Sequence, residues 1–250
     1  MTTHDGASSQ RNQTIARYSA LAREAIAGAT ITDCEPGTFA DGEFGAAGYS
    51  DSDVPEPALR ASLGCGNPVA VADLQSGETV LDLGSGGGLD VLLSARRVGP
   101  AGLAYGLDGS EDMLALASSN AARADVSNVR FLLGHIEEIP LPDDHIDVII
   151  SNCVLNLSAN KPRVLAEAFR VLRPGGRLGI SDVIADSGLD PQQRTEAENQ
   201  VGCTSGTLTR AEYEGMLARA GFASASVTVT NDAGCGLHSA IVRAVKPAES

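Results

Sequence analysis

Val80-Leu81-Asp82-Leu83-Gly84-Ser85-Gly86-Gly87-Gly88 is the stretch that decides the fold, because a short apolar run leads directly into a glycine-rich turn. The run from Thr79 to Leu83 predicts a buried strand. The glycines permit a tight turn and a close approach of the backbone to a ligand. Residues 89–98 then predict a helix, whose first N–H groups can face an anion. Position 89 is leucine, so the strict dinucleotide-binding pattern of glycines is not met.

The alternation of strand and helix continues along the chain. Further strands are predicted at 101–107, 128–133, 146–151 and 177–184, and helices at 110–124 and 161–172. Strands that alternate with helices of this length are typical of a parallel sheet. After a helix at 209–220, strands at 224–230 and 238–245 predict an antiparallel hairpin at the sheet edge. We therefore expect an α/β fold with a doubly wound, mostly parallel, seven-stranded sheet and a late antiparallel hairpin.

The chain divides into three regions by composition. The polar residues 1–10 are predicted to be a disordered N-terminus. Residues 11–70 are expected to form N-terminal helices, at 11–27, at 56–63 and from Asn67 onward, and a lid over the substrate site. Residues 71–250 are expected to form the ligand-binding domain, with a substrate-site insertion near 186–208.

The net charge of −14 excludes some classes of partner. A field of this sign repels phosphate backbones and anionic membrane surfaces, so nucleic acid and membranes are not expected as partners. No apolar run approaches the ~20 residues that span a bilayer, and Met1 to Gln10 does not resemble a signal peptide. We therefore expect a cytoplasmic protein.

An acidic residue stands in register with the glycine turn. Asp108 ends the second predicted strand, 24 residues after Gly84, where a carboxylate can accept hydrogen bonds from ribose hydroxyls. The turn with Asp82, followed by Asp108 and the late hairpin, resembles class I S-adenosylmethionine-dependent methyltransferases. The resemblance implies S-adenosyl-L-methionine as cofactor, with its methionine part at the glycine turn, its ribose at Asp108 and its adenine near 134–137. The implied cofactor-binding residues are Asp82, Gly84, Ser85, Gly86, Gly88, Asp108, Met113, Ile136, Glu137 and Asn152.

Five cysteines indicate the methyl acceptor. No Cys-x-x-Cys pair exists, which argues against a zinc finger, and we expect free thiols rather than a disulfide scaffold. Residues 62–68, 150–157 and 201–206, which contain Cys65, Cys153 and Cys203, each resemble a cysteine segment of arsenite methyltransferases. Cys34 is a candidate further ligand, and Cys235 is interpreted as an ordinary thiol.

The physical chemistry of the thiols supports this resemblance. Cys153 follows the fourth predicted strand, so it should face the same crevice as the glycine turn. Three thiolates from Cys65, Cys153 and Cys203 would suit a soft centre such as As(III). The predicted reaction is direct methyl transfer to thiolate-bound arsenic, without a general base. The expected partners are arsenite or its glutathione conjugate and a thiol reductant, glutathione or thioredoxin.

Two alternatives remain open at this stage. One is a methyltransferase of a small organic acceptor such as a quinone, which would need a general base and no thiols. The other is a non-catalytic, thiol-based metalloid sensor that retains a cofactor-shaped pocket.

Overall fold

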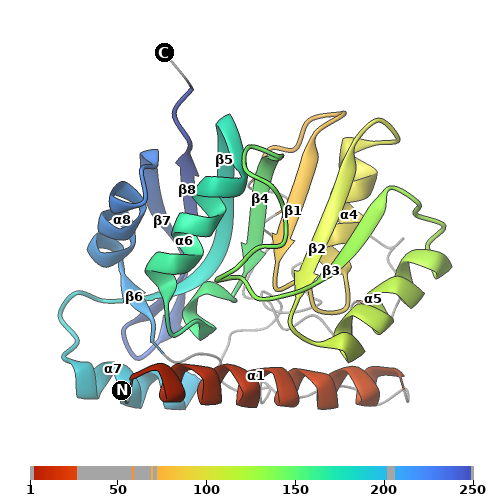
Figure 1. Ribbon diagram of the computed structural model, residues 1–250. Helices are drawn as coiled ribbons and strands as arrows, with labels where there is room; N and C mark the ends of the chain where they lie inside the picture. The colour runs from red at the N-terminus through yellow and green to blue at the C-terminus, as the bar shows by residue number, and fades with distance from the viewer. Residues whose placement is uncertain (1–2, 27–57, 59–68, 70–71, 202–205, 249–250) are drawn as a thin grey trace.

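The computed structural model describes residues 3–26, 58, 69, 72–201 and 206–248. Figure 1 shows a twisted central sheet with helices on both faces. The strands are β1 (Thr79–Leu83), β2 (Leu103–Asp108), β3 (Val129–Leu133), β4 (Ile146–Asn152), β5 (Leu172–Ala185), β6 (Leu208–Thr209), β7 (Ala223–Gly234) and β8 (Leu237–Val245). The helices are α1 (Thr3–Ile26), α4 (Leu89–Val98), α5 (Glu111–Arg123), the 3-10 turn η2 (Leu155–Leu157), α6 (Lys161–Val171), α7 (Pro191–Val201) and α8 (Arg210–Arg219).

The sheet has the strand order β3-β2-β1-β4-β5-β8-β7, with the two-residue β6 paired to β5. Neighbouring strands from β3 to β5 are parallel, whereas β8 is antiparallel to both β5 and β7. The predicted doubly wound, mostly parallel sheet with a late antiparallel hairpin is therefore confirmed, and the two-residue β6 adds an eighth strand to the seven predicted ones. The strand order reverses between β1 and β4, and open α/β sheets bind ligands at such a point.

Alternating side chains of the central strands fill two separate cores. Leu81 and Ile149 pack on the face covered by α6 and α8, whereas Val80 and Val148 pack on the opposite face with Val98 of α4. All five side chains are fully buried. This burial on both faces explains why the strands read as nearly continuous apolar runs.

Two segments contain helix that was not expected from the sequence. Helix α1 begins at Thr3, so the stretch predicted to be disordered is helical from residue 3 onward. Once Leu21, Ala22 and Ala25 dock against α5, extending the helix toward its N-terminus requires little additional free energy. The predicted insertion near 186–208 contains a helix, α7, which the sequence analysis did not assign. The predicted helices at 56–63 and from Asn67 lie outside the described residues, except for Ala58 and Val69, which are helical.

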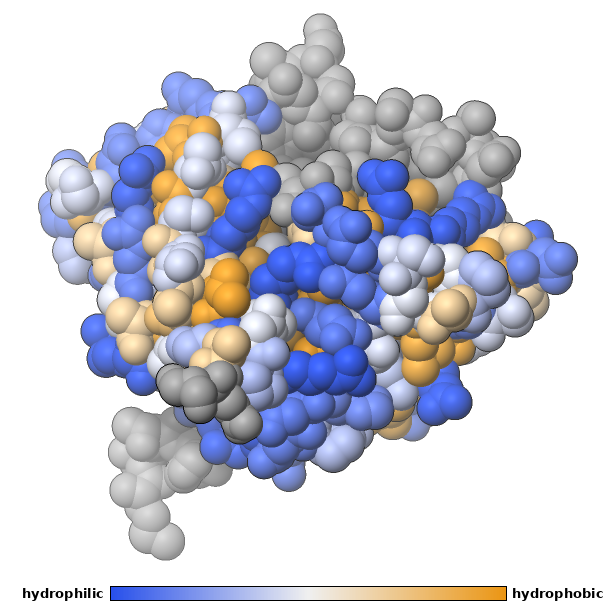
Figure 2. Space-filling model, turned by 90° about the horizontal axis from the view of Figure 1, so that it is seen from above, coloured by the Kyte–Doolittle hydropathy of each residue, from blue (hydrophilic) through white to orange (hydrophobic). Residues whose placement is uncertain are grey.

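The surface carries its apolar residues in small groups. The face seen in Figure 2, at the end of the sheet remote from α1, is dominated by hydrophilic residues. The large hydrophobic residues that are exposed, Ile26, Leu133 and Val229, lie on three different elements. No helix within the described residues combines the length and the apolar composition needed to cross a bilayer.

Candidate active site

A cavity of about 320 Å³ opens at the carboxyl ends of β1, β2 and β4. Helix α1 runs along this end of the sheet (Figure 1) and contributes to the wall. The wall is formed by Arg11, Thr14, Ile15, Tyr18, Ala58, Asp82, residues 84–87, Leu89, Asp90, Asp108, Gly109, Met113, residues 134–137, residues 152–154 and residues 157–160. The cavity thus lies where the topology places a ligand site.

The glycine turn contributes residues 84–87 to the cavity wall, and its backbone is left-handed at Gly84, Gly86 and Gly88, with φ of 73°, 49° and 84°. A Cβ at Gly84 would lie 2.5 Å from the side chain of Val154, so glycine is required there by packing. A Cβ on Gly86 would point into open space, with its nearest neighbour the Met113 sulfur at 4.0 Å. Backbone at position 86 is therefore accessible to a ligand.

Gly88 has a different role from the one predicted. It caps the N-terminus of α4, and a Cβ there would lie 3.0 Å from the Cβ of Ala117 on α5. It is absent from the cavity wall formed by the described residues. Gly88 therefore serves close packing of two helices rather than direct contact with a ligand.

Three carboxyl groups, Asp82, Asp90 and Asp108, make the cavity wall beside the glycine turn acidic. Asp82 is buried, and desolvation, followed by the nearby charges of Asp90 and Asp108, raises its pKa well above the ordinary value. Asp108 accepts hydrogen bonds from the backbone N–H groups of Gly86 and Ser110, both at 2.9 Å. Burial raises the pKa of Asp108, while these donors act in the opposite direction. The wall therefore favours cations and hydroxyl groups.

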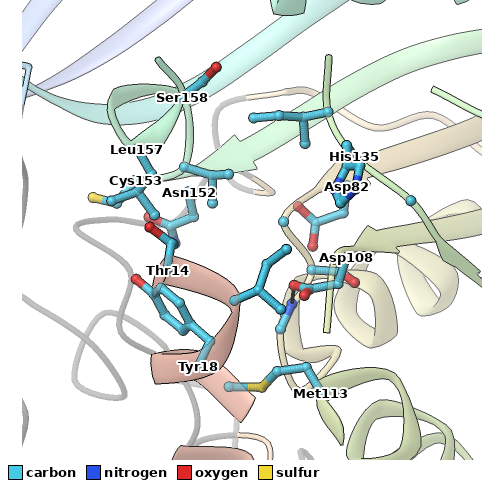
Figure 3. A pocket seen from close by; sticks show the side chains of 18 of the residues that line it. Thr14, Tyr18, Asp82, Asp108, Met113, His135, Asn152, Cys153, Leu157 and Ser158 are labelled. Atoms are coloured by element: carbon cyan, nitrogen blue, oxygen red, sulfur yellow. Dashed lines mark hydrogen bonds between the residues drawn. The ribbon is translucent and has the colours of Figure 1, made fainter. Parts of the chain in front are cut away.

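The remaining predicted cofactor residues also line the cavity: Ser85, Met113, Ile136, Glu137 and Asn152. The Asn152 amide donates to Asp90 at 3.5 Å, and Glu137 accepts from the hydroxyl of Ser158 at 2.5 Å. His135 lies in the wall as well. Figure 3 shows Asp82 and Asp108 facing Asn152 across the cavity.

Cys153 is the one predicted arsenic ligand among the described residues. It lies on the same side of the cavity as Asn152 (Figure 3), and its exposed fraction is 8%. Its backbone N–H donates to Ser181 at 2.8 Å, and its φ is 57°. Its side chain packs with apolar residues of β5, α7 and the β7–β8 hairpin. The strand end thus fixes where this sulfur enters the wall.

The oxidation state of Cys153 differs from the expectation of free thiols, because Cys153 is disulfide-bonded. Its partner is not among the described residues, and Cys34, Cys65 and Cys203 also lie outside them. Cys235 is free and exposed, and its thiol donates to Gln200 at 3.0 Å.

A buried polar network lies behind the Cys153 segment. Asp182 on β5 is fully buried and accepts from the Asn156 amide at 2.7 Å, from the Val183 N–H at 2.9 Å and from the Tyr213 hydroxyl at 3.2 Å. Desolvation raises the pKa of Asp182 to about 7, although these donors and the nearby Lys161 charge act in the opposite direction. Asp182 does not line the cavity, so it supports the wall from behind.

Helix α1 contributes cavity residues that were not named as site residues from the sequence. Thr14, Ile15 and Tyr18 line the cavity at helical spacing. Ile15 and Tyr18 belong to the apolar face that predicted the helix, but nothing local indicated where that helix would dock. Residues 157–160 were also missed, and only their proximity to Cys153 in the sequence could have suggested them.

Comparison with known proteins identifies the family. A family model described as a methyltransferase domain matches residues 74–221. The chain belongs to this methyltransferase family. The match covers the sheet from β1 to β6 and all of the glycine turn, so the cavity is that of a methyltransferase.

Individual relatives of this methyltransferase extend the comparison. It is 41% identical over 216 residues to an arsenite methyltransferase of Halobacterium salinarum, a match that covers 80% of this chain and 55% of that protein. It is also 41% identical over 166 residues to an arsenite methyltransferase of Aquipseudomonas alcaligenes, a match that covers 64% of this chain and 47% of that protein. The chain therefore spans about half the length of these curated relatives.

A crystal structure gives the corresponding comparison in space. The arsenic(III) S-adenosylmethionine methyltransferase of Chlamydomonas reinhardtii matches with a TM-score of 0.66 and 32% identity, covering 78% of this chain and 71% of that one. The similarity of fold therefore extends well beyond the glycine turn.

Proposed function

We propose that this methyltransferase is an arsenite methyltransferase, which transfers a methyl group from S-adenosylmethionine to As(III) held by cysteine thiolates. The observation that carries the proposal is the position of Cys153. Cys153 belongs to the wall of the same cavity as the glycine turn and Asp108. A soft ligand therefore stands beside a pocket suited to the methyl donor. The similarity to arsenite methyltransferases supports the same acceptor.

The described residues fit S-adenosylmethionine. The open backbone at Gly86 suits the methionine part, and Asp108 is placed to accept from ribose hydroxyls. Asp82 and Asp90 offer negative charge to a cationic ligand, and residues 134–137 form the wall proposed for adenine. When bound, the cofactor supplies a methyl group on a positively charged sulfur. The role of the protein is to hold acceptor and donor in line, which contributes several kcal/mol, roughly.

Arsenic capture requires thiolates from Cys65, Cys153 and Cys203, with Cys34 as a candidate further ligand. Because Cys153 is disulfide-bonded in the structure, two electrons must first be supplied. A dithiol such as reduced thioredoxin, or two glutathione molecules, would reduce the bond and become a disulfide in turn. Arsenite or its glutathione conjugate would then exchange its oxygen or sulfur ligands for the protein thiolates, and the displaced groups would carry away the thiol protons.

No general base is required, because the lone pair of arsenic forms the new bond to carbon while the carbon–sulfur bond of the donor breaks. Two carboxyl groups near the acceptor side agree with this. Glu137 is engaged by Ser158, and Asp182 is fully buried behind the wall. The dependence on reduced thiols favours a reducing compartment, so we propose a cytoplasmic detoxification enzyme. We also propose that residues 11–70 act as a lid and that 186–208 contributes to the acceptor side.

The proposal is tested by following labelled methyl transfer to arsenite with glutathione present. Cys153→Ser and Cys203→Ser should each abolish turnover while cofactor affinity stays nearly unchanged, because a hydroxyl is a poor ligand for a soft centre. Cys65→Ser should impair the first methylation, and Cys34→Ser should produce a milder defect when thiol is limiting. Cys235→Ser, the matched control, should be close to the parent, since this exposed thiol does not line the cavity.

The outcomes separate the competing functions. Wild-type turnover by both Cys153→Ser and Cys203→Ser would refute arsenic as the acceptor and favour a small organic one. A parent protein that binds arsenite and cofactor but releases no labelled methylarsenical would favour the sensor.

A further inference from the structure

Arg11 on α1 carries an unsatisfied donor into the cavity wall. The side chain is half-buried and lines the cavity, and its Nε is buried without a hydrogen-bond partner. A buried N–H of a charged group that lacks an acceptor is destabilising by a few kcal/mol, roughly. Because the guanidinium remains charged at any physiological pH, an acceptor on a bound ligand would relieve the mismatch.

The charges around the cavity make Arg11 distinctive. The acidic residues of the described wall are Asp82, Asp90, Asp108 and Glu137, and the chain as a whole has a net charge of −14. Within that described wall, Arg11 is the one lysine or arginine. A ligand that carries a carboxylate would be repelled by the acidic side and attracted to Arg11.

The position of Arg11 along α1 places it toward the acceptor end. Figure 3 shows Tyr18 near Met113 and Thr14 near Cys153. Arg11 precedes Thr14 by three residues and Tyr18 by seven, so all three lie on one helix face, and Arg11 is about 10 Å along the axis from Tyr18. Toward its N-terminus, α1 runs away from α5 and toward α7 (Figure 1). Arg11 therefore lies about one helical turn further along α1 from Tyr18 than Thr14 does.

We propose that Arg11 is a carboxylate-binding residue of the active site, whose planar guanidinium pairs with a carboxylate of a bound ligand. The inference rests on the proposed function, which offers two carboxylates of the same chemistry. One belongs to the methionine part of the cofactor, and the other to the thiol that delivers arsenic, such as glutathione. A guanidinium can bind either one with two parallel hydrogen bonds.

The cofactor source is tested by calorimetry with two neutral-sulfur ligands. S-adenosylhomocysteine carries the amino-acid carboxylate, and 5′-methylthioadenosine lacks it. If Arg11 binds the cofactor carboxylate, Arg11→Met should weaken the binding of S-adenosylhomocysteine about ten- to a hundredfold, as expected for loss of a charged hydrogen bond. The affinity for 5′-methylthioadenosine should stay unchanged. Arg11→Lys keeps the positive charge but lacks the two parallel N–H donors of the guanidinium, so it should recover part of the lost affinity for S-adenosylhomocysteine.

The thiol source is tested by arsenite binding to the reduced protein, once in glutathione and once in 2-mercaptoethanol, which has no carboxylate. If Arg11 binds the carrier thiol, Arg11→Met should weaken binding in glutathione more than in 2-mercaptoethanol, by about tenfold. Arg17→Met is the matched control, because Arg17 is an exposed residue of the same helix outside the cavity wall. It should match the parent in every assay.

The results distinguish this inference from the proposed function. A loss of affinity confined to the carboxylate-bearing member of either pair supports Arg11 as the carboxylate-binding residue. The pair in which it occurs identifies which ligand supplies the carboxylate. Unchanged affinities in both pairs, with a parent that binds normally, would overturn the inference alone. A parent that binds neither S-adenosylhomocysteine nor arsenite would refute the proposed function, and this inference with it.

Discussion

Asp182→Asn should reduce the pH dependence of stability. Burial raises the pKa of Asp182 from its ordinary value of 3.8 to about 7 in the folded state. Below about pH 4 the carboxyl is protonated in both states and has no effect. As the pH rises, the unfolded chain ionises first, so the folded state loses stability until the pH passes the folded pKa. The total loss is ~4 kcal/mol, of which ~3 kcal/mol falls between about pH 5 and about pH 8.

The assay is urea denaturation followed by circular dichroism at these two pH values, with reductant in every sample. Asparagine cannot ionise, and its NH₂ group replaces a carboxyl oxygen among neighbours that donate to Asp182, so the variant should be less stable than the parent at about pH 5. That deficit should shrink by ~3 kcal/mol at about pH 8. Asp125→Asn is the control, because Asp125 is exposed and its φ of 52° suits asparagine. An equal pH dependence in parent and Asp182→Asn would refute an Asp182 pKa near 7.

Three further variants test the glycine turn and the ribose site, and a fourth serves as a control. Asp108→Ala should weaken S-adenosylmethionine binding by about 1.5–3 kcal/mol in calorimetry, through loss of a charged acceptor, and unchanged affinity would remove Asp108 from the site. Gly84→Ala should destabilise the fold by about 2–4 kcal/mol in urea, because φ is positive and the new Cβ meets Val154 at 2.5 Å. Gly175→Ala, whose φ is also positive but whose Cβ meets nothing, should show only the backbone part. Gly86→Val should abolish cofactor binding, since its side chain would enter the cavity; binding retained at parental affinity would contradict this.

Much of the fold could be predicted because hydrophobic pattern and burial coincide. The predicted strand at Thr79 to Leu83 and the helix at 89–98 match β1 and α4 residue for residue. Helix α7 was missed because its sequence, from Pro191 to Val201, is polar and shows little apolar periodicity. Its packing depends on single contacts, such as Ala197 beside Cys153, and these are properties of the assembled fold.

The site divides in the same way. Residues carried by a local motif, such as Asp82, Gly86 and Asn152, lie in the cavity wall as predicted. Residues that reach the cavity through docking of α1, such as Arg11 and Tyr18, could not be placed from the sequence. A helical pattern shows which side of the helix is buried but not which surface it packs against. Gly88 lies outside the described cavity wall and packs against α5, and spacing alone does not distinguish a glycine that faces a ligand from one that faces a helix.

The place of β8 within the sheet has a consequence for synthesis of the chain. β8 follows every other strand in sequence, yet it lies between β5 and β7. Until residues 237–245 have left the ribosome, the long strand β5 keeps one edge unpaired along nine residues, from Arg177 to Ala185. Such an edge can pair with other chains. Nascent chains in which residues 237–245 are still inside the ribosome should therefore aggregate or recruit chaperones, whereas chains that have released these residues should become resistant to protease.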